Sequence, residues 1–119
     1  MKIFVSHSTS FNFKDEFYKP IKESSLFSKH EFIFPHDTDE AFNTKDTIQN
    51  ICDVILAEVS YSSTGQGIEL GWADIYNIPI VCIYKNGAKT SRSLKKITDQ
   101  FIVYEDSKDM IEKLISFIK

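Results

Sequence analysis

Residues 53–59 read DVILAEV, a nearly continuous apolar run near the middle of the chain. Such a run is typical of a strand that is buried on both faces of a parallel sheet, because a half-exposed strand would alternate apolar and polar residues. Shorter apolar runs with strand character lie on either side of it, at residues 2–6, 31–34, 79–84 and 101–104. The central run therefore predicts an α/β protein built around a buried parallel sheet.

Segments with helical periodicity separate these predicted strands. They cover residues 11–23, 43–50, 68–77 and 107–118. Because crossovers between parallel strands are right-handed, regular alternation of strand and helix predicts one sheet with helices on both faces. We therefore predict a single doubly wound, flavodoxin-like α/β domain over residues 1–119, with five parallel strands in the order 2-1-3-4-5.

Composition excludes several classes of function. A length of 119 residues suits one domain with one hydrophobic core, and a net charge of −3 argues against a protein that binds nucleic acid. No apolar run approaches the roughly 20 residues of a membrane span, and the polar amino-terminal sequence does not resemble a secretion signal. Cys52 and Cys82 lack metal-ligand spacing, and the three histidines form no metal-binding pattern. We therefore expect a cytoplasmic protein with buried thiols and without metal or cofactor.

The predicted strand order has a switch point between the first and third strands. In open α/β sheets, ligands bind outside the carboxyl ends of the strands at such a point. Two loops meet there, residues 7–10 after the first strand and residues 60–69 after the third. His7 and Ser8 in the first loop are therefore candidate ligand-binding residues, with a purely structural hydrogen-bonding role for His7 as the alternative.

The second loop leads into a helix within the sequence SYSSTGQGIELGWA, residues 60–73. Gly65 and Gly67 would allow a tight turn, with backbone N–H groups facing an anion at the helix amino terminus. Glu69 is expected in the first helical turn, where the helix dipole would favour its ionised form. An ionised carboxylate at this place can attack an anomeric carbon or stabilise an oxocarbenium ion, and a helix-capping role is the alternative.

Residues 52–73, CDVILAEVSYSSTGQGIELGWA, resemble the signature of the nucleoside 2-deoxyribosyltransferase superfamily, which includes the 2′-deoxynucleoside 5′-phosphate N-hydrolases. That signature is roughly (A/S)DVVVAEV, a short polar loop and GxGxELGxA. The resemblance implies that Glu69 is the nucleophile on C1′ of the sugar. It also implies that Ser63 contacts a 5′-phosphate near the amides of Gly65 and Gly67. Ser93 would reach the same phosphate across a dimer interface, so the protein would be at least a homodimer.

The chain departs from this family at several positions. Phe4, a candidate substrate-binding residue, stands where the family often has a tyrosine in the first strand, and His7 stands where it usually has a glycine. Most members carry an aspartate eight residues before the residue that is Asp53 here, and that position is Lys45. A one-residue gap would place Asp46 there as the general acid. The preceding loop holds three alternative proton donors, His36, Asp37 and Asp39.

Three further side chains have both structural and functional interpretations. Asp53 opens the central strand, where it either hydrogen-bonds the backbone or contacts the ligand. Glu58 lies inside the apolar run and is expected to pair with a neighbour at the carboxyl end of the strand, because an unpaired buried charge is costly. Trp72 either packs into the core or a dimer interface, or stacks on a base.

Together these observations favour an enzyme that cleaves the N-glycosidic bond of a (deoxy)nucleoside or its 5′-monophosphate, by hydrolysis or by base transfer. Ser63 and Ser93 favour a monophosphate, and the short chain leaves little room for a second base. The expected partners are a small-molecule nucleoside or nucleotide and a second copy of the chain, with neither nucleic acid nor membrane. Two alternatives are a noncatalytic nucleotide-sensing module, which Lys45 favours, and an NAD glycohydrolase. The latter follows from residues 4–10, FVSHSTS, which are similar to the first strand of Toll/interleukin-receptor (TIR) domains.

Overall fold

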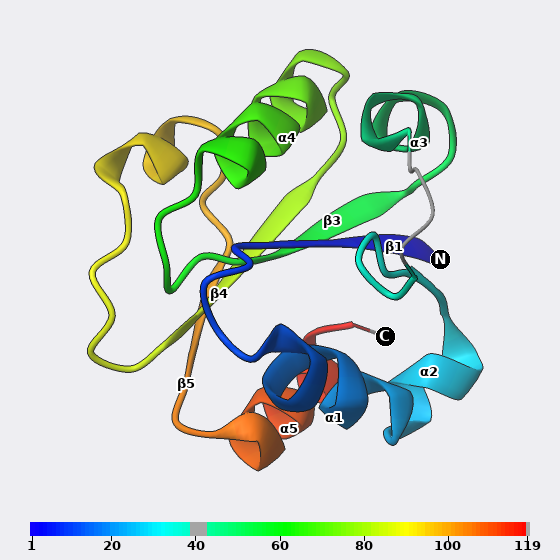
Figure 1. Cartoon of the computed structure of the whole chain (residues 1–119), viewed down its shortest axis with the longest axis vertical. Helices are drawn as coiled ribbons and strands as arrows, with labels where there is room; N and C mark the ends of the chain where they lie inside the picture. Colours follow the sequence, from blue (N-terminus) through cyan, green and yellow to red (C-terminus); the bar gives the residue numbers. More distant parts are fainter. Residues whose placement is uncertain (39–42, 119) are drawn as a thin grey trace.

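The computed structural model describes residues 1–38 and 43–118 and contains a five-stranded sheet between two layers of helices (Figure 1). The strands are β1 (Lys2–His7), β2 (Glu31–Ile33), β3 (Val54–Glu58), β4 (Ile80–Lys85) and β5 (Phe101–Tyr104). Their order in the sheet is β2-β1-β3-β4-β5, and every neighbouring pair is parallel. The predicted flavodoxin-like topology is therefore confirmed.

The helices cover both faces of the sheet, as Figure 1 shows. One layer contains the π-helical segment η1 (Lys14–Tyr18), α1 (Lys19–Lys22), α2 (Ser25–Lys29) and α5 (Ser107–Phe117). The other layer contains α3 (Thr44–Asn50), α4 (Thr64–Ile75) and the 3-10 helix η2 (Arg92–Lys96). Because strand residues alternate between faces, Ile3 and Val5 pack in the α1/α5 core while Phe4 packs in the α3/α4 core.

The predicted helix at residues 11–23 is replaced by η1 followed by the short helix α1. Pro20 has no backbone N–H, so the regular α-helical hydrogen-bond ladder cannot run through this point. The carbonyl of Glu16, four residues earlier, instead accepts a hydrogen bond from the Ser107 hydroxyl at 3.2 Å. This contact joins the beginning of α5 to η1.

Helix α4 begins earlier than predicted, at Thr64 rather than at residue 68. Ser63 is its N-cap, and the Ser63 hydroxyl accepts a hydrogen bond from the Gln66 backbone N–H at 3.4 Å. Gly65 and Gly67 therefore lie inside the helix, and neither has a positive φ angle. The expectation that these two glycines form a tight turn is wrong, because the Ser63 cap starts the helix before them.

Both cysteines are free and buried, as predicted. Burial raises the pKa of the Cys52 thiol to about 11 and that of Cys82 to about 12, so both thiols stay protonated and unreactive near neutral pH. In the described part of the chain no helix has the length and apolar character needed to cross a membrane.

Candidate active site

Glu69 points from α4 toward the carboxyl end of β1. The Ser6 hydroxyl, on a residue that is completely buried, donates a hydrogen bond of 2.7 Å to Glu69 Oε1. Ser6 pairs with Ala57 where β1 and β3 lie side by side. The half-buried Glu69 carboxylate therefore lies at the predicted switch point of the sheet.

The electrostatic environment of Glu69 differs from the expected one. Because α4 starts at Thr64, Glu69 lies in the second turn, beyond the first turn where a helix dipole acts on charges. Burial raises the pKa of Glu69, and the hydrogen bond from Ser6 partly offsets this effect. The expectation that the dipole favours the ionised form is therefore wrong. The hydrogen bond from the Ser6 hydroxyl favours the ionised form instead.

Sequence reasoning missed two residues of this site, Ser6 and Gln66. The Gln66 side chain is buried, and its amide Nε2 donates to the Ser6 carbonyl at 3.1 Å and to the Glu58 carbonyl at 2.8 Å. A polar residue between two glycines, and a serine near the end of an apolar strand, were the available signals. The hydrogen bonds that join Ser6 to Gln66 and to Glu69 span 60 and 63 residues of the chain, which local patterns do not reveal.

His7 has a structural role in this molecule. It is buried on the α1/α5 side, where its Nδ1–H donates to the Ser8 carbonyl at 2.8 Å and its Nε2 accepts from the Tyr18 hydroxyl at 2.6 Å. Burial lowers the pKa of His7 to about 4, so the ring is neutral near pH 7. Tyr18 in turn accepts a hydrogen bond of 3.2 Å from the His36 backbone N–H. Both ring nitrogens of His7 are thus engaged within the protein, which does not fit the predicted ligand contact.

Three other predicted ligand-binding residues are also engaged or buried. Ser8 is buried, and its hydroxyl pairs with the Ser10 hydroxyl at 2.7 Å. Phe4 is completely buried in the core beneath α3 and α4. Asp53 lies at the amino end of β3, where it accepts a hydrogen bond of 2.7 Å from the Lys2 N–H. The five residues of β3 separate Asp53 from the Glu58 end of the strand by about 16 Å, so Asp53 lies at the opposite end of the strand from the switch point.

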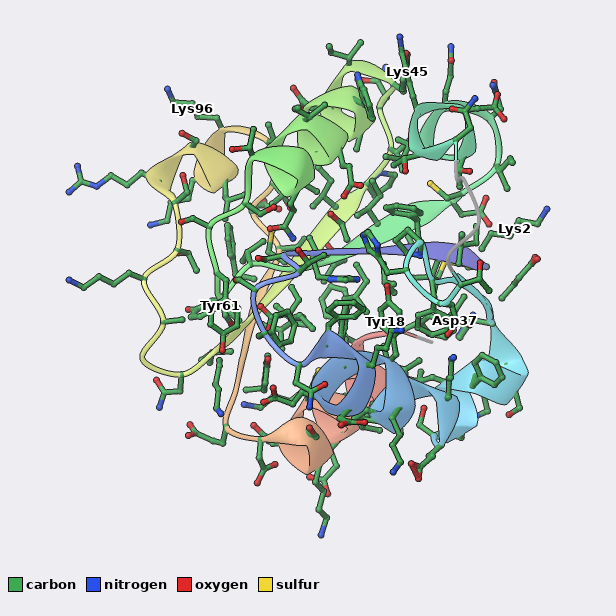
Figure 2. All side chains as sticks on the ribbon, in the orientation of Figure 1. Lys2, Tyr18, Asp37, Lys45, Tyr61 and Lys96 are labelled. Carbon is green, nitrogen blue, oxygen red and sulfur yellow. The ribbon has the colours of Figure 1, made fainter. Side chains whose placement is uncertain are left out.

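The candidate proton donors lie in different environments. Asp46 is exposed in the first turn of α3, where its carboxylate accepts a hydrogen bond of 2.8 Å from Asn50. Lys45, which occupies the expected aspartate position, points outward from the molecule (Figure 2). Asp37 forms an ion pair of 2.5 Å with Lys22. His36 is exposed, with its ring 5.4 Å from that of His7. Asp39 lies outside the described residues.

Glu58 is fully buried at the end of β3 and pairs with its neighbours, as predicted. Its carboxylate accepts hydrogen bonds from the Ser60 N–H at 2.6 Å, from the Ser60 hydroxyl at 3.0 Å, and from the Tyr104 hydroxyl. Burial raises the pKa of Glu58 despite these donors. Glu58 therefore holds the start of the loop before α4.

Trp72 packs against the core beneath α4, which agrees with its structural interpretation.

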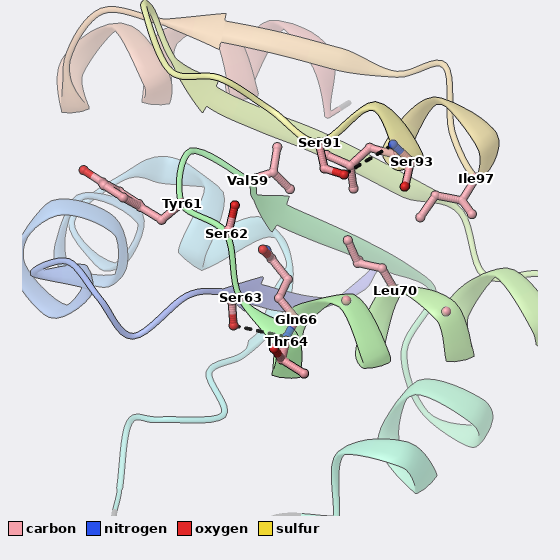
Figure 3. Close-up of a pocket in the computed structure, with 13 residues that line it drawn as sticks. Val59, Tyr61, Ser62, Ser63, Thr64, Gln66, Leu70, Ser91, Ser93 and Ile97 are labelled. Carbon is pink, nitrogen blue, oxygen red and sulfur yellow. Dashed lines mark hydrogen bonds between the residues drawn. The ribbon is translucent and has the colours of Figure 1, made fainter.

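A cavity of about 540 Å³ lies between α4 and the segment around η2 (Figure 3). Ser63 and Gly67 line one side of it and Ser93 lines the other, while Gly65 and Glu69 are not among its lining residues. The segment at residues 85–96 beside it carries five lysine or arginine residues and no acidic one. One chain therefore brings Ser63 and Ser93 to the same cavity, and the contribution of Ser93 across a dimer interface stays a prediction.

Gln66 connects the cavity with the surroundings of Glu69. Gln66 lines the cavity, and the same side chain is hydrogen-bonded to the carbonyl of Ser6, whose hydroxyl holds Glu69. The arrangement offers a carboxylate with one fixed donor next to a recess lined by hydroxyl groups. Such a set can carry out nucleophilic chemistry on a ligand whose other end lies in the recess.

Neither a protein-family model nor a curated protein sequence matches the chain. Among solved structures, the chain is similar to the CMP N-glycosidase BcmB of Clostridium botulinum, with a TM-score of 0.69, 20% sequence identity, and 99% of this chain and 100% of that chain covered. It is also similar to a conserved protein from Enterococcus faecalis V583, with a TM-score of 0.63, 13% identity and 99% of each chain covered. The chain therefore shares its fold with an N-glycosidase, and the match covers nearly the whole length of both chains.

Proposed function

We propose that this protein cleaves the N-glycosidic bond of a nucleoside 5′-monophosphate, with Glu69 as the nucleophile. The observation that carries the proposal is the half-buried Glu69 carboxylate, held by the Ser6 hydroxyl at 2.7 Å beside the switch point of the sheet. The likeness of the fold to that of a CMP N-glycosidase and the resemblance of residues 52–73 to the deoxyribosyltransferase signature support the same chemistry.

In the proposed reaction, Ser6 holds Oε1 of Glu69 while Oε2 attacks C1′ of the sugar. The new C1′–O bond forms as the C1′–N bond breaks, and the electron pair of that bond goes to the base nitrogen, which takes up a proton from a general acid. Water then attacks C1′ of the glycosyl ester and gives its proton to the conjugate base of that acid. Glu69 leaves as a carboxylate, so the net reaction adds one water across the N-glycosidic bond.

We assign the general acid to His36. Among the candidate donors that the structure describes, Asp37 is engaged with Lys22 and Asp46 with Asn50. The His36 side chain is exposed, and its backbone N–H, three residues after the end of β2, donates a hydrogen bond to the Tyr18 hydroxyl. Imidazole is the side chain best suited to give and take a proton near neutral pH.

The phosphate is proposed to lie in the cavity between α4 and η2. Ser63 and Ser93 offer hydroxyl groups from its two sides, and the amino end of the twelve-residue helix α4 faces the same space. The cationic segment at residues 85–96 adds a favourable potential for a dianion. These features favour a monophosphate over a free nucleoside.

The first experiment is incubation of the purified protein with deoxynucleosides, ribonucleosides, their 5′-monophosphates and NAD, with and without an added free base. We expect release of free base from a monophosphate, and a loss of at least about 10³-fold in rate for Glu69→Gln, which keeps the shape of the side chain. Glu112→Gln on the exposed surface of α5 is the matched control and should retain the native rate. Exchange with the added base would identify a transferase.

A noncatalytic nucleotide-binding module is the second candidate. It is favoured by Asp46, the expected general acid, which is exposed and engaged with Asn50. Binding of a monophosphate measured by calorimetry, without release of base from any compound in the panel, would establish this candidate and reject the enzyme.

A further inference from the structure

Gln66 makes two hydrogen bonds that the proposed reaction does not use. Its side chain is 5% exposed, and its Nε2 donates to the Ser6 carbonyl at 3.1 Å and to the Glu58 carbonyl at 2.8 Å. Because both acceptors are carbonyl oxygens, the amide nitrogen must face them, and both of its hydrogens are used. Gln66 thereby ties α4 to the ends of the two strands that form the switch point.

Helix α4 contacts Ser6 twice, at positions one helical turn apart. Gln66 holds the Ser6 carbonyl, and Glu69 accepts the Ser6 hydroxyl. Residues three apart lie on one face of a helix. These two hydrogen bonds together therefore fix both the position of α4 along its axis and its rotation about that axis, relative to β1. A shift of α4 would break the contact between Ser6 and Glu69.

The first turn of α4 needs such an anchor because its own stability is low. Gly65 and Gly67 flank Gln66, and each glycine costs about 1 kcal/mol of helix stability relative to alanine. Thr64 and both glycines are exposed, so Gln66 is the one buried side chain among residues 64–67. Its two hydrogen bonds connect an intrinsically weak turn to the rigid sheet.

We propose that Gln66 is a positioning residue for the nucleophile: its carboxamide holds Ser6 and α4 in the register that keeps the Ser6 hydroxyl on the Glu69 carboxylate. The inference rests on the proposed function and extends it to a position that the GxGxELG signature leaves open. Gln66 touches no reacting atom and acts through Ser6.

The test is a carboxyl-carbon NMR titration of Glu69 in the native protein, in Gln66→Met, in Ser6→Ala and in the double variant. Methionine has a similar length but no donor, so the hydrogen bond from Ser6 to Glu69 should loosen and the pKa of Glu69 should rise. The rise should match that in Ser6→Ala, and the double variant should add nothing further. Tyr18 is the described titratable group that interacts with Glu69, and burial raises its pKa, so it stays neutral throughout.

Kinetics give a second readout. Gln66→Met should lower kcat about 10- to 100-fold and leave KM within about threefold, because misplacement of the nucleophile affects the transition state more than binding. Gln49→Met on the exposed surface of α3 is the control and should change neither quantity.

An unchanged or lowered pKa of Glu69 in folded Gln66→Met would overturn the proposal. If this variant does not fold, the same titration is carried out on Gln66→Asn, because the asparagine side chain is too short to reach the carbonyls of both Ser6 and Glu58. Loss of the folded state in both variants would assign Gln66 to folding and also overturn the proposal. The titration requires no turnover, so a protein that releases no base would contradict the proposed function without affecting this result.

Discussion

At the scale of single residues, two opposing effects act on the Glu69 carboxylate. Burial disfavours its charged form and raises its pKa, while the Ser6 hydroxyl favours the charged form by donating a hydrogen bond. The proposed nucleophile must be ionised to react. The strength of the Ser6 hydrogen bond therefore sets how far the reaction extends toward acid pH.

Ser6→Ala is predicted to raise the pKa of Glu69 further, because burial remains and the donor is lost. The acidic limb of the pH profile of kcat/KM should move to higher pH, and kcat/KM near pH 7 should fall about 10- to 100-fold, as expected for a hydrogen bond to a charged group. Ser28→Ala, on the exposed surface of α2, serves as the control. A profile identical to that of the native protein would show that Ser6 does not act on Glu69.

At the scale of elements, the glycines of α4 lower its helix propensity, and two of them line the cavity. Gly67 and Gly71 line the cavity one helical turn apart, and a Cβ atom added at either position would meet no atom within 4 Å. Glycine is thus not required there by the fold of this chain. The open space in front of both residues is consistent with room for a ligand.

Gly67→Ala and Gly71→Ala are each predicted to raise the free energy of unfolding by up to about 1 kcal/mol, because alanine favours the helix. Gly67→Ala should also weaken the binding of a nucleoside monophosphate, since its methyl group enters the cavity near Ser63. Gly71→Ala, one turn further from Ser63, should weaken it less. Urea unfolding measures the first effect and calorimetric titration the second. Equal affinities of the native protein and Gly67→Ala for the monophosphate would show that the ligand does not bind in this cavity.

At the scale of the whole molecule, the buried network around His7 connects three parts of the chain. His7 at the end of β1 bonds to Tyr18 of η1, and Tyr18 bonds to the backbone of His36 after β2. Burial lowers the pKa of His7 from 6.5 to about 4. In the unfolded chain the ring takes up a proton at higher pH than in the folded protein, so protonation favours unfolding.

His7 is therefore predicted to contribute stability that is fully present above about pH 6.5 and is lost as the pH falls toward 4, by about 3 kcal/mol in total. His7→Gln removes this titration. The free energy of unfolding from urea denaturation should consequently fall less between pH 7 and pH 4.5 in the variant than in the native protein. The same fall in both proteins would mean that His7 does not become protonated on acid unfolding.

The sequence by itself determined the sheet and its topology. The apolar run at residues 53–59 and its weaker neighbours identify five strands, because burial on both faces leaves a local signature in each segment. Alternation with helices then leaves few ways to connect the strands. The position of Glu69 at the switch point also followed from the sequence, since it depends on strand order and a local motif, while its role as the nucleophile stays a prediction.

Tertiary structure alone decided what surrounds Glu69. Ser6 and Gln66 are 60 residues apart in the chain, and Ser6 and Glu69 are 63 apart, so no local pattern connects them. The same long-range packing buries Phe4, engages His7 with Tyr18 and places Asp53 at the far end of β3. Periodicity reports which face of an element is buried. Which partner lies against that face depends on the three-dimensional arrangement, and the partner determines the chemistry of the side chain.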